Sequence, residues 1–185
     1  MTSTQEAPVM TTTALTGERA DILETLTVHR QFLRQTVQGL TDDQARQRTT
    51  ASELTLGGLI KHVAEVEKGW ADFVVSGPES MGGDTDWSEP TPEQIEQFRA
   101  GFQLLPDETL DGVLARYEEV ARRTDELVAT VDLDLSHPLP EAPWFPKDAR
   151  RSARRAFLHI VAETAQHAGH ADIIRESLDG QKTMG

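Results

Sequence analysis

Apolar residues recur at steps of three and four positions along four stretches of the chain, a spacing that gathers them on one side of an α-helix. The stretches cover about 17–38, 56–75, 108–131 and 153–178. No stretch alternates apolar and polar residues over enough positions to predict a convincing strand. The pattern therefore predicts an all-α fold in which the apolar sides of four helices meet in a bundle.

The borders of these stretches carry residues that start or stop helices. Thr55, Asp107 and Ser152 are the expected N-caps of the last three helices, because a side-chain oxygen at that position accepts a hydrogen bond from a free backbone N–H. Gly39 and Gly180 are the expected stops of the first and last helices, since glycine readily adopts the left-handed conformation that ends many helices. The borders thus agree with the apolar periodicity.

The two long connections differ in composition. Residues 76–106 are rich in Gly, Pro, Ser and acidic residues, and one short helical turn is expected after Thr91. A connection of this length can run the length of a bundle, so we expect a long crossover between the second and third helices. Residues 132–150 contain four prolines and predict an extended crossing.

Two glycines, Gly57 and Gly58, occupy the first turn of the second predicted helix, where glycine lowers helix propensity. A second backbone that passes close to this turn would explain both of them. Simple tolerance of glycine at these positions is the alternative.

Composition and charge narrow the classes of function. The chain has 18 basic and 31 acidic side chains, and its net charge of -13 repels nucleic acid and anionic membrane surfaces. No apolar stretch reaches the roughly 18 residues that a membrane span needs, and the start of the chain lacks the pattern of a secretion signal. We therefore expect a cytoplasmic protein, with residues 1–15 as a disordered tail and 16–180 as a single domain.

The apolar side of the last predicted helix is interrupted by a column of polar residues. At about 100° per residue, Glu163 and His167 lie about 40° apart, and His170 lies about 20° on the other side of Glu163. His159 falls on the same stripe. Burial of a carboxylate and imidazoles costs several kcal/mol without compensation, so these groups must pair with one another, with water or with a cation.

A divalent metal would satisfy this column. Glu163 and His167 are four residues apart and present two ligands one helical turn apart on one face, and His62, midway along the second helix, is the natural third ligand. Two imidazoles and a carboxylate favour zinc, while nickel, manganese and ferrous iron also accept this set. Three protein ligands leave a position open, as in catalytic sites. The alternative is a group of core histidines that hydrogen bonds alone satisfy.

The sequence also contains HRQFLRQTVQGLTDDQ, LTLGGLIKHVAEVEKGW and FLHIVAETAQHAGHADIIRESLDG. In these segments, and over about 15–180, it resembles the DinB/YfiT-like superfamily and within it the actinobacterial branch of mycothiol-dependent S-transferases. The resemblance implies a four-helix bundle with a crossover between the second and third helices, and a metal held by His62, Glu163 and His167. Glu163 stands where many relatives have a histidine, an arrangement similar to that of mycothiol-dependent maleylpyruvate isomerase.

The activity that this resemblance implies is the metal-dependent transfer of a low-molecular-weight thiol, mycothiol, to an electrophilic small molecule, a reaction of detoxification. The chain has no cysteine, so any thiol must come from outside the protein. A metal-dependent hydrolase that activates water at the same residues is the first alternative. A bundle that binds a small molecule without catalysis is the second.

Further side chains have expected roles around this site. His170 is the candidate catalytic residue, as a proton relay or as a hydrogen-bond partner of a ligand, with a fourth metal ligand as the less favoured alternative. His159 and His29 are expected near the metal ligands. The candidate substrate-binding residues are Arg154, Trp70 and Trp144. The expected partners are a small-molecule substrate and a low-molecular-weight thiol, with no nucleic acid and no membrane, and a homodimer is compatible with a bundle of this size.

Overall fold

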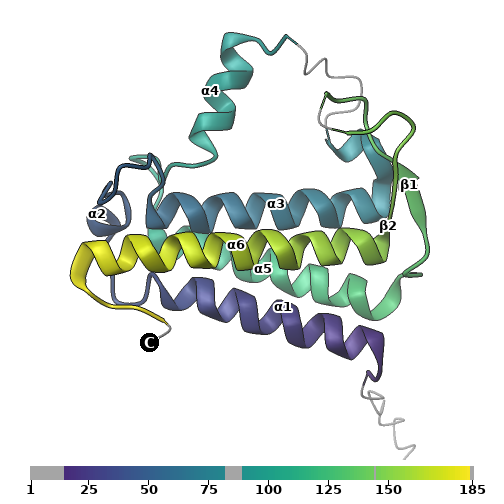
Figure 1. The fold of residues 1–185 in the computed structure, drawn as a ribbon, viewed down its shortest axis with the longest axis horizontal. Coiled ribbons are helices and arrows are strands. Elements are labelled where there is room, and N and C mark those ends of the chain that lie inside the picture. Colours follow the sequence, from purple (N-terminus) through teal and green to yellow (C-terminus); the bar gives the residue numbers. More distant parts are fainter. Residues whose placement is uncertain (1–14, 82–88, 144, 184–185) are drawn as a thin grey trace, which may run out of the picture.

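The computed structural model describes residues 15–81, 89–143 and 145–183. Four long helices form a bundle (Figure 1), and they are α1 (Glu18–Gln35), α3 (Leu56–Ser76), α5 (Leu110–Thr130) and α6 (Ala153–Asp179). These helices coincide with the four periodic stretches, so the predicted all-α four-helix bundle is confirmed. The shorter elements are α2 (Asp42–Ala45), the 3-10 helix η1 (Gly77–Met81), α4 (Pro92–Ala100), β1 (Ser136–Pro138) and β2 (Arg150–Ser152).

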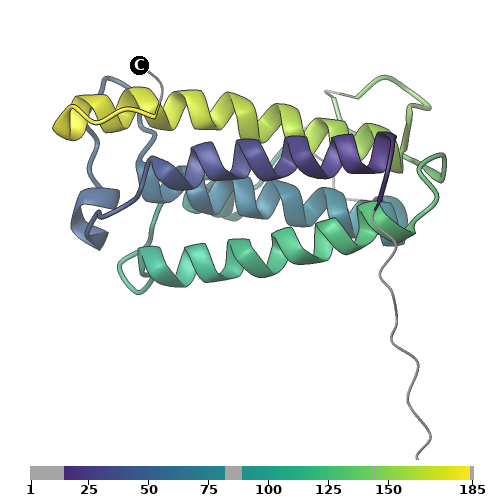
Figure 2. The same cartoon turned by 90° about the horizontal axis from the view of Figure 1, so that it is seen from below.

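Helices α1 and α6 lie side by side and run in the same direction (Figure 2). At their first turns Arg154 of α6 forms an ion pair with Glu18 of α1. At the other end Arg175 of α6 donates a hydrogen bond of 2.9 Å to the backbone carbonyl of Thr36, just after α1. The buried guanidinium of Arg175 therefore satisfies free carbonyls at the end of α1 and holds the two helices in register.

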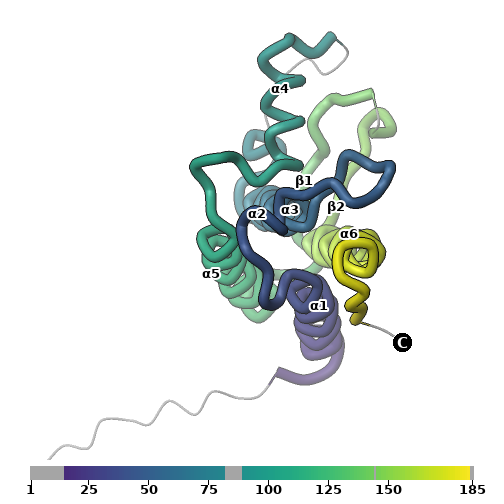
Figure 3. The backbone as a smooth tube through the Cα atoms, turned by 90° about the vertical axis from the view of Figure 1, so that its left-hand side faces the viewer, coloured from purple at the N-terminus to yellow at the C-terminus, as the bar shows by residue number. Residues whose placement is uncertain are grey.

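The second and third bundle helices, α3 and α5, are also parallel neighbours. Lys61 in the second turn of α3 pairs with Glu108, just before α5, at 2.7 Å, and Asp72 near the end of α3 pairs with Arg123 of α5. Parallel neighbours need a connection that returns along the bundle, and η1 and α4 belong to this connection, with α4 visible outside the bundle in Figure 1. The predicted crossover is thus confirmed. In the view along the bundle, α4 stands apart from the four packed helices (Figure 3).

The core consists of two apolar clusters, one toward each end of the bundle. One cluster includes Leu33 of α1 and Leu59 of α3, and the other includes Leu26 of α1 and Phe157 of α6. Removal of these side chains from water is the main favourable contribution to folding. Polar side chains are buried at the middle of the bundle, between the clusters, and they are Arg30, Glu67, Thr124 and Thr164.

Four local features differ from the prediction. Helix α1 ends at Gln35 with Thr36 as its C-cap, so Gly39 ends the turns that follow the helix and not the helix itself. The N-cap of α5 is Thr109, whose Oγ1 accepts a hydrogen bond from the N–H of Gly112 at 3.1 Å, so the prediction of Asp107 as N-cap was wrong. Helix α4 is nine residues long, more than the single turn expected after Thr91. The proline-rich crossing contains β1, which pairs with β2 in an antiparallel two-stranded sheet. Strands of three residues are too short to show an alternating pattern, which is why the sequence does not reveal them.

The close approach expected at Gly57 and Gly58 is confirmed. A Cβ atom built on Gly58 would lie 1.9 Å from the carbonyl oxygen of Phe102, and one on Gly57 would lie 3.0 Å from a side-chain carbon of Leu104. The segment after α4 therefore rests directly on the first turn of α3. Only glycine at position 58 leaves room for that backbone.

Within the described part of the chain, no helix combines the length and the hydrophobicity needed to cross a bilayer.

Candidate metal centre

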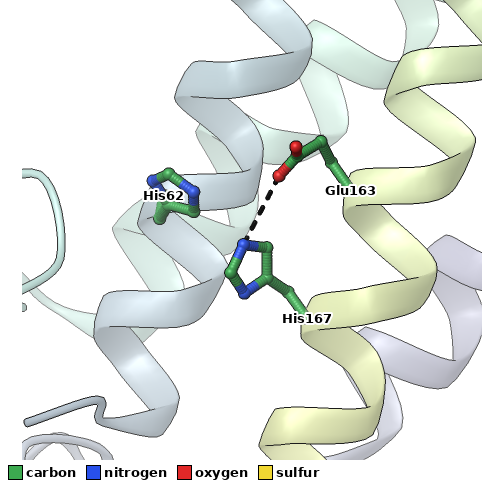
Figure 4. Close-up of side chains that lie close together, drawn as sticks. All are labelled: His62, Glu163 and His167. Carbon is green, nitrogen blue, oxygen red and sulfur yellow. Dashed lines mark ion pairs between the residues drawn. The ribbon is translucent and has the colours of Figure 1, made fainter. Parts of the chain in front are cut away.

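Three side chains from two helices converge between α3 and α6 (Figure 4). His62 comes from α3, Glu163 and His167 come from α6, and one potential ligand atom of each lies within 4.8 Å of those of the other two. The Nε2 atom of His167 lies 3.5 Å from Oε2 of Glu163. The rings of His62 and His167 meet edge to face, with their centroids 4.8 Å apart. The structure thus brings the three expected ligands together.

The helices themselves explain this convergence. Residues 163 and 167 are one turn apart on α6, so their side chains leave the helix on the same face. Helix α3 runs antiparallel to α6, and the contact between His62 and His167 and the ring contact between Trp70 and His159 fix the register of the two helices. His62 therefore reaches the level of the pair on α6.

Burial keeps both imidazoles neutral. Desolvation, helped by repulsion from His167, lowers the pKa of His62 from 6.5 to about 4. Desolvation also lowers the pKa of His167, although the carboxylate of Glu163 acts in the opposite direction. A neutral imidazole keeps the nitrogen lone pair that binds a metal, whereas a protonated ring has none to offer.

The three residues fit a divalent metal ion by the chemistry of their donors. Two neutral imidazole nitrogens and one carboxylate oxygen form a ligand set that suits zinc and its first-row neighbours. Ligand atoms of a tetrahedral zinc ion lie about 3.3 Å apart, so donors within 4.8 Å of one another need only small side-chain rotations to share one ion. With three protein ligands such an ion would keep a position for a further molecule.

Two more histidines on α6 contact this group of donors. The Nδ1 atom of His170 lies 3.4 Å from Nδ1 of His167, on the side of the ring opposite to Glu163. The Nε2 atom of His159 lies 3.4 Å from Oε1 of Glu163. Each of them can hydrogen-bond a donor residue and orient it.

Phe102 also contacts the cluster and was not found from the sequence. Its ring stacks on the imidazole of His62, with centroids 4.0 Å apart and an angle of 21° between the planes. It belongs to the segment that rests on Gly58, so the glycine in the first turn of α3 was the one signal in the sequence that a distant segment reaches this place. The sequence does not reveal which residue that segment contributes.

Three of the other candidate residues, Arg154, His29 and Trp70, do not join the cluster. Arg154 forms ion pairs with Glu18 and Asp134 at the first turn of α6. His29 has its ring contact with Phe32 of α1, at 6.2 Å. Trp70 is only 8% exposed and packs in the core, where its ring meets that of His159 edge to face with centroids 4.8 Å apart. Trp144 lies outside the described residues.

Comparison with known proteins bears on both fold and function. The family model described as Mycothiol-S-transferase matches residues 21–180. No curated protein matches the chain. A crystal structure of a conserved protein from Enterococcus faecalis is similar, with a TM-score of 0.65 and 13% sequence identity over 90% of this chain and 100% of the other. At this identity the second likeness concerns the fold alone.

Proposed function

The chain belongs to the mycothiol S-transferase family, and on that basis we propose that it transfers a low-molecular-weight thiol of the mycothiol type to an electrophilic small molecule. In this proposal His62, Glu163 and His167 hold a divalent metal ion, with zinc favoured by the ligand set. The observation that carries it is the convergence of the three donor side chains from α3 and α6.

The chain's own composition supports an external thiol. It has no cysteine, so the sulfur nucleophile must come from a co-substrate. When bound, a divalent metal supplies a Lewis acid that lowers the pKa of a thiol and favours the thiolate at neutral pH. In the transfer the thiol loses its proton to a base, the sulfur forms a bond to the electrophilic carbon, and the leaving group departs with its bonding electrons.

Each donor side chain has a defined task. The neutral rings of His62 and His167 offer nitrogen lone pairs, and Glu163 contributes a negative charge. His159 places Nε2 3.4 Å from Oε1 of Glu163, close enough for a small rotation of its ring to let it hold the carboxylate in place.

His170 acts as a positioning residue in this proposal. His167 and His170 have their Nδ1 atoms 3.4 Å apart, and the N–H of His167 can donate a hydrogen bond to His170. The proton of His167 is then on Nδ1, so the lone pair of its Nε2, on the side of Glu163, is free to bind the metal. The same hydrogen bond occupies the one lone pair of a neutral His170 ring, so this ring has none left to accept a thiol proton. A proton relay through His170, the other role expected from the sequence, requires the opposite direction of this bond.

The test compares metal content and turnover in the wild-type protein and in His167→Ala. We expect elemental analysis to find about one divalent ion per wild-type chain and much less in the variant. We expect wild-type protein to convert monochlorobimane only when mycothiol is present. Turnover without any thiol would instead favour a metal-dependent hydrolase. Absence of metal, with stability and ligand binding unchanged in His62→Ala, would favour a binding protein without catalysis.

The native metal, cytoplasmic location and assembly into a homodimer stay predictions. Each has a direct measurement: elemental analysis, fractionation of the source cells and sedimentation of the purified protein.

A further inference from the structure

Helix α4 presents apolar residues to solvent without a packing reason. None of its nine residues is buried, while Ile95 is 39% and Phe98 is 65% exposed. Local signals suffice to form the helix: Thr91 is the N-cap of a capping box that includes Gln94, and Pro92 occupies the first turn. The helix therefore does not need Phe98 at this exposed position in order to form, and folding of the bundle does not explain why a phenylalanine is there.

Ring contacts lead from this exposed helix to the candidate metal centre. The ring of Phe98 meets that of Phe102 edge to face, with centroids 5.2 Å apart. Phe102 in turn stacks on His62 at 4.0 Å. Ile95, Phe98 and Phe102 are spaced by three and four positions, so they follow one face of the helix and its continuation. An apolar path thus runs from solvent to a donor side chain.

Phe102, the residue of this path that contacts His62, is held in place by contacts of its own backbone and of the two residues after it. The carbonyl of Phe102 passes so close to Gly58 that no side chain fits between them. The next residue, Gln103, accepts a hydrogen bond of 3.3 Å from Nζ of Lys61 through its carbonyl, and the side chain of Leu104 is buried in the core. Phe102 is therefore fixed beside His62, and Phe98 lies about one helical turn further out.

We propose that an aromatic wall binds the ring of a flat apolar electrophile beside the candidate metal centre. This wall is formed by the rings of Phe98 and Phe102, with the side chain of Ile95 next to them. This inference rests on the proposed transferase function and adds the class of substrate. Aromatic rings attract one another in stacked and edge-to-face arrangements with centroids about 4.5–7 Å apart, and Phe98 leaves most of its surface free for such a contact.

Charge argues against an anionic electrophile at this place. Lys61, next to His62 in sequence, is already paired with Glu108 at 2.7 Å. The chain as a whole carries a net charge of -13, which repels anions. Halogenated nitroarenes combine a flat apolar ring with an electrophilic carbon. In their reaction the thiol loses its proton to a buffer base, its sulfur forms a bond to the ring carbon, and halide leaves with the bonding electrons.

The test separates ring binding from catalysis. The variant is Phe98→Ala, whose side chain is exposed enough for the substitution to leave the bundle folded. The matched control is Ile173→Ala on α6, at a site that is 62% exposed and belongs to neither proposed site. The first readout is the equilibrium dissociation constant of 1,3-dinitrobenzene, which has no leaving halide, measured by calorimetry. The second is the KM for 1-chloro-2,4-dinitrobenzene and for iodoacetamide, which has no ring, with mycothiol as the thiol.

We expect Phe98→Ala to raise the dissociation constant of dinitrobenzene and the KM for the chlorinated ring about 3- to 10-fold, the range that one aromatic pair accounts for. The constants for iodoacetamide and the metal content should stay unchanged, and Ile173→Ala should behave as wild type. Equal dinitrobenzene binding by wild type and Phe98→Ala would overturn the aromatic wall. A third outcome separates the two proposals. If the wild-type protein turns over neither electrophile, but Phe98→Ala binds dinitrobenzene more weakly than wild type does, the aromatic wall is supported and the transferase function is refuted.

Discussion

Arg30 of α1 and Glu67 of α3 form an ion pair at the middle of the bundle, where the side chain of Glu67 has no solvent exposure. The Nε atom of Arg30 donates to Oε2 of Glu67 at 3.1 Å, and a second nitrogen donates to the other carboxylate oxygen. Arg30 also pairs with Asp125 of α5 at 2.8 Å. One guanidinium therefore links three of the four bundle helices.

We predict that Arg30→Met destabilises the protein by about 3–5 kcal/mol, because it leaves the carboxylate of Glu67 buried without a counter-charge. Urea denaturation measures the free energy of unfolding. The double variant Arg30→Met with Glu67→Leu should recover most of the loss, since two apolar side chains need no partner. If the free energy of unfolding of Arg30→Met alone lay within about 1 kcal/mol of the wild-type value, the carboxylate of Glu67 would have to find another partner or be protonated.

Gly58→Ala should destabilise the protein by about 1–3 kcal/mol, because its Cβ would stand 1.9 Å from the carbonyl oxygen of Phe102 and force the segment away. Gly69→Ala on the same helix is the matched control. A Cβ there meets nothing within 4 Å, so the change should stabilise α3 by about 0.5–1 kcal/mol. Thermal unfolding of both variants checks the opposite signs, and equal effects would contradict the close approach.

Glu163→Ala should weaken zinc binding by more than about 100-fold, because it removes a negatively charged metal ligand. Loss of a residue that only orients a ligand typically weakens binding by up to about 100-fold. Competition with a chromogenic chelator measures the affinity. Glu176→Ala, on an exposed position of the same helix, is the control and should bind zinc as wild type does. An unchanged affinity in Glu163→Ala would place the metal elsewhere.

His170→Ala should lower zinc affinity by about 10- to 100-fold, the effect of losing a partner that orients a metal ligand. The pH dependence of kcat/KM, measured with saturating zinc, should keep its shape, since a positioning residue transfers no proton. Loss of one limb of that profile in the variant would instead identify His170 as the proton relay.

Glu108 should make stability depend on acid pH. Burial opposes its ionisation, but hydrogen bonds from Lys61, the N–H of Leu105 and Arg116 prevail and lower its pKa from 4.5 to about 2. The folded state thus releases this proton more readily than the unfolded chain, so the stabilisation is present above about pH 4.5 and is lost as the pH falls toward 2. Glu108→Gln should therefore cost about 1.5–3 kcal/mol at pH 7 and progressively less below pH 4.5, as followed by urea denaturation at each pH. A cost independent of pH would contradict the charged pairs.

Local geometry explains how much of the fold was predictable. A period of 3.6 residues depends only on neighbours in the chain, so the positions of α1, α3, α5 and α6 followed from apolar spacing. The same holds for Glu163 and His167, which one turn of helix places on one face whatever surrounds them. The cap of α5 was misplaced by two residues because Asp107 and Thr109 are both good N-caps, and their side chains alone do not distinguish them.

Contacts between distant segments depended on the packing of whole elements. Arg154 is a candidate substrate-binding residue in the sequence, yet the parallel arrangement of α1 and α6 brings it to Glu18. Phe102 reaches His62 because the crossover after α4 lands on Gly58, a contact that joins residues far apart in the chain. Periodicity along one helix carries no information on which loop will cover it, since that choice is made by the sum of many weak contacts formed together when the bundle closes.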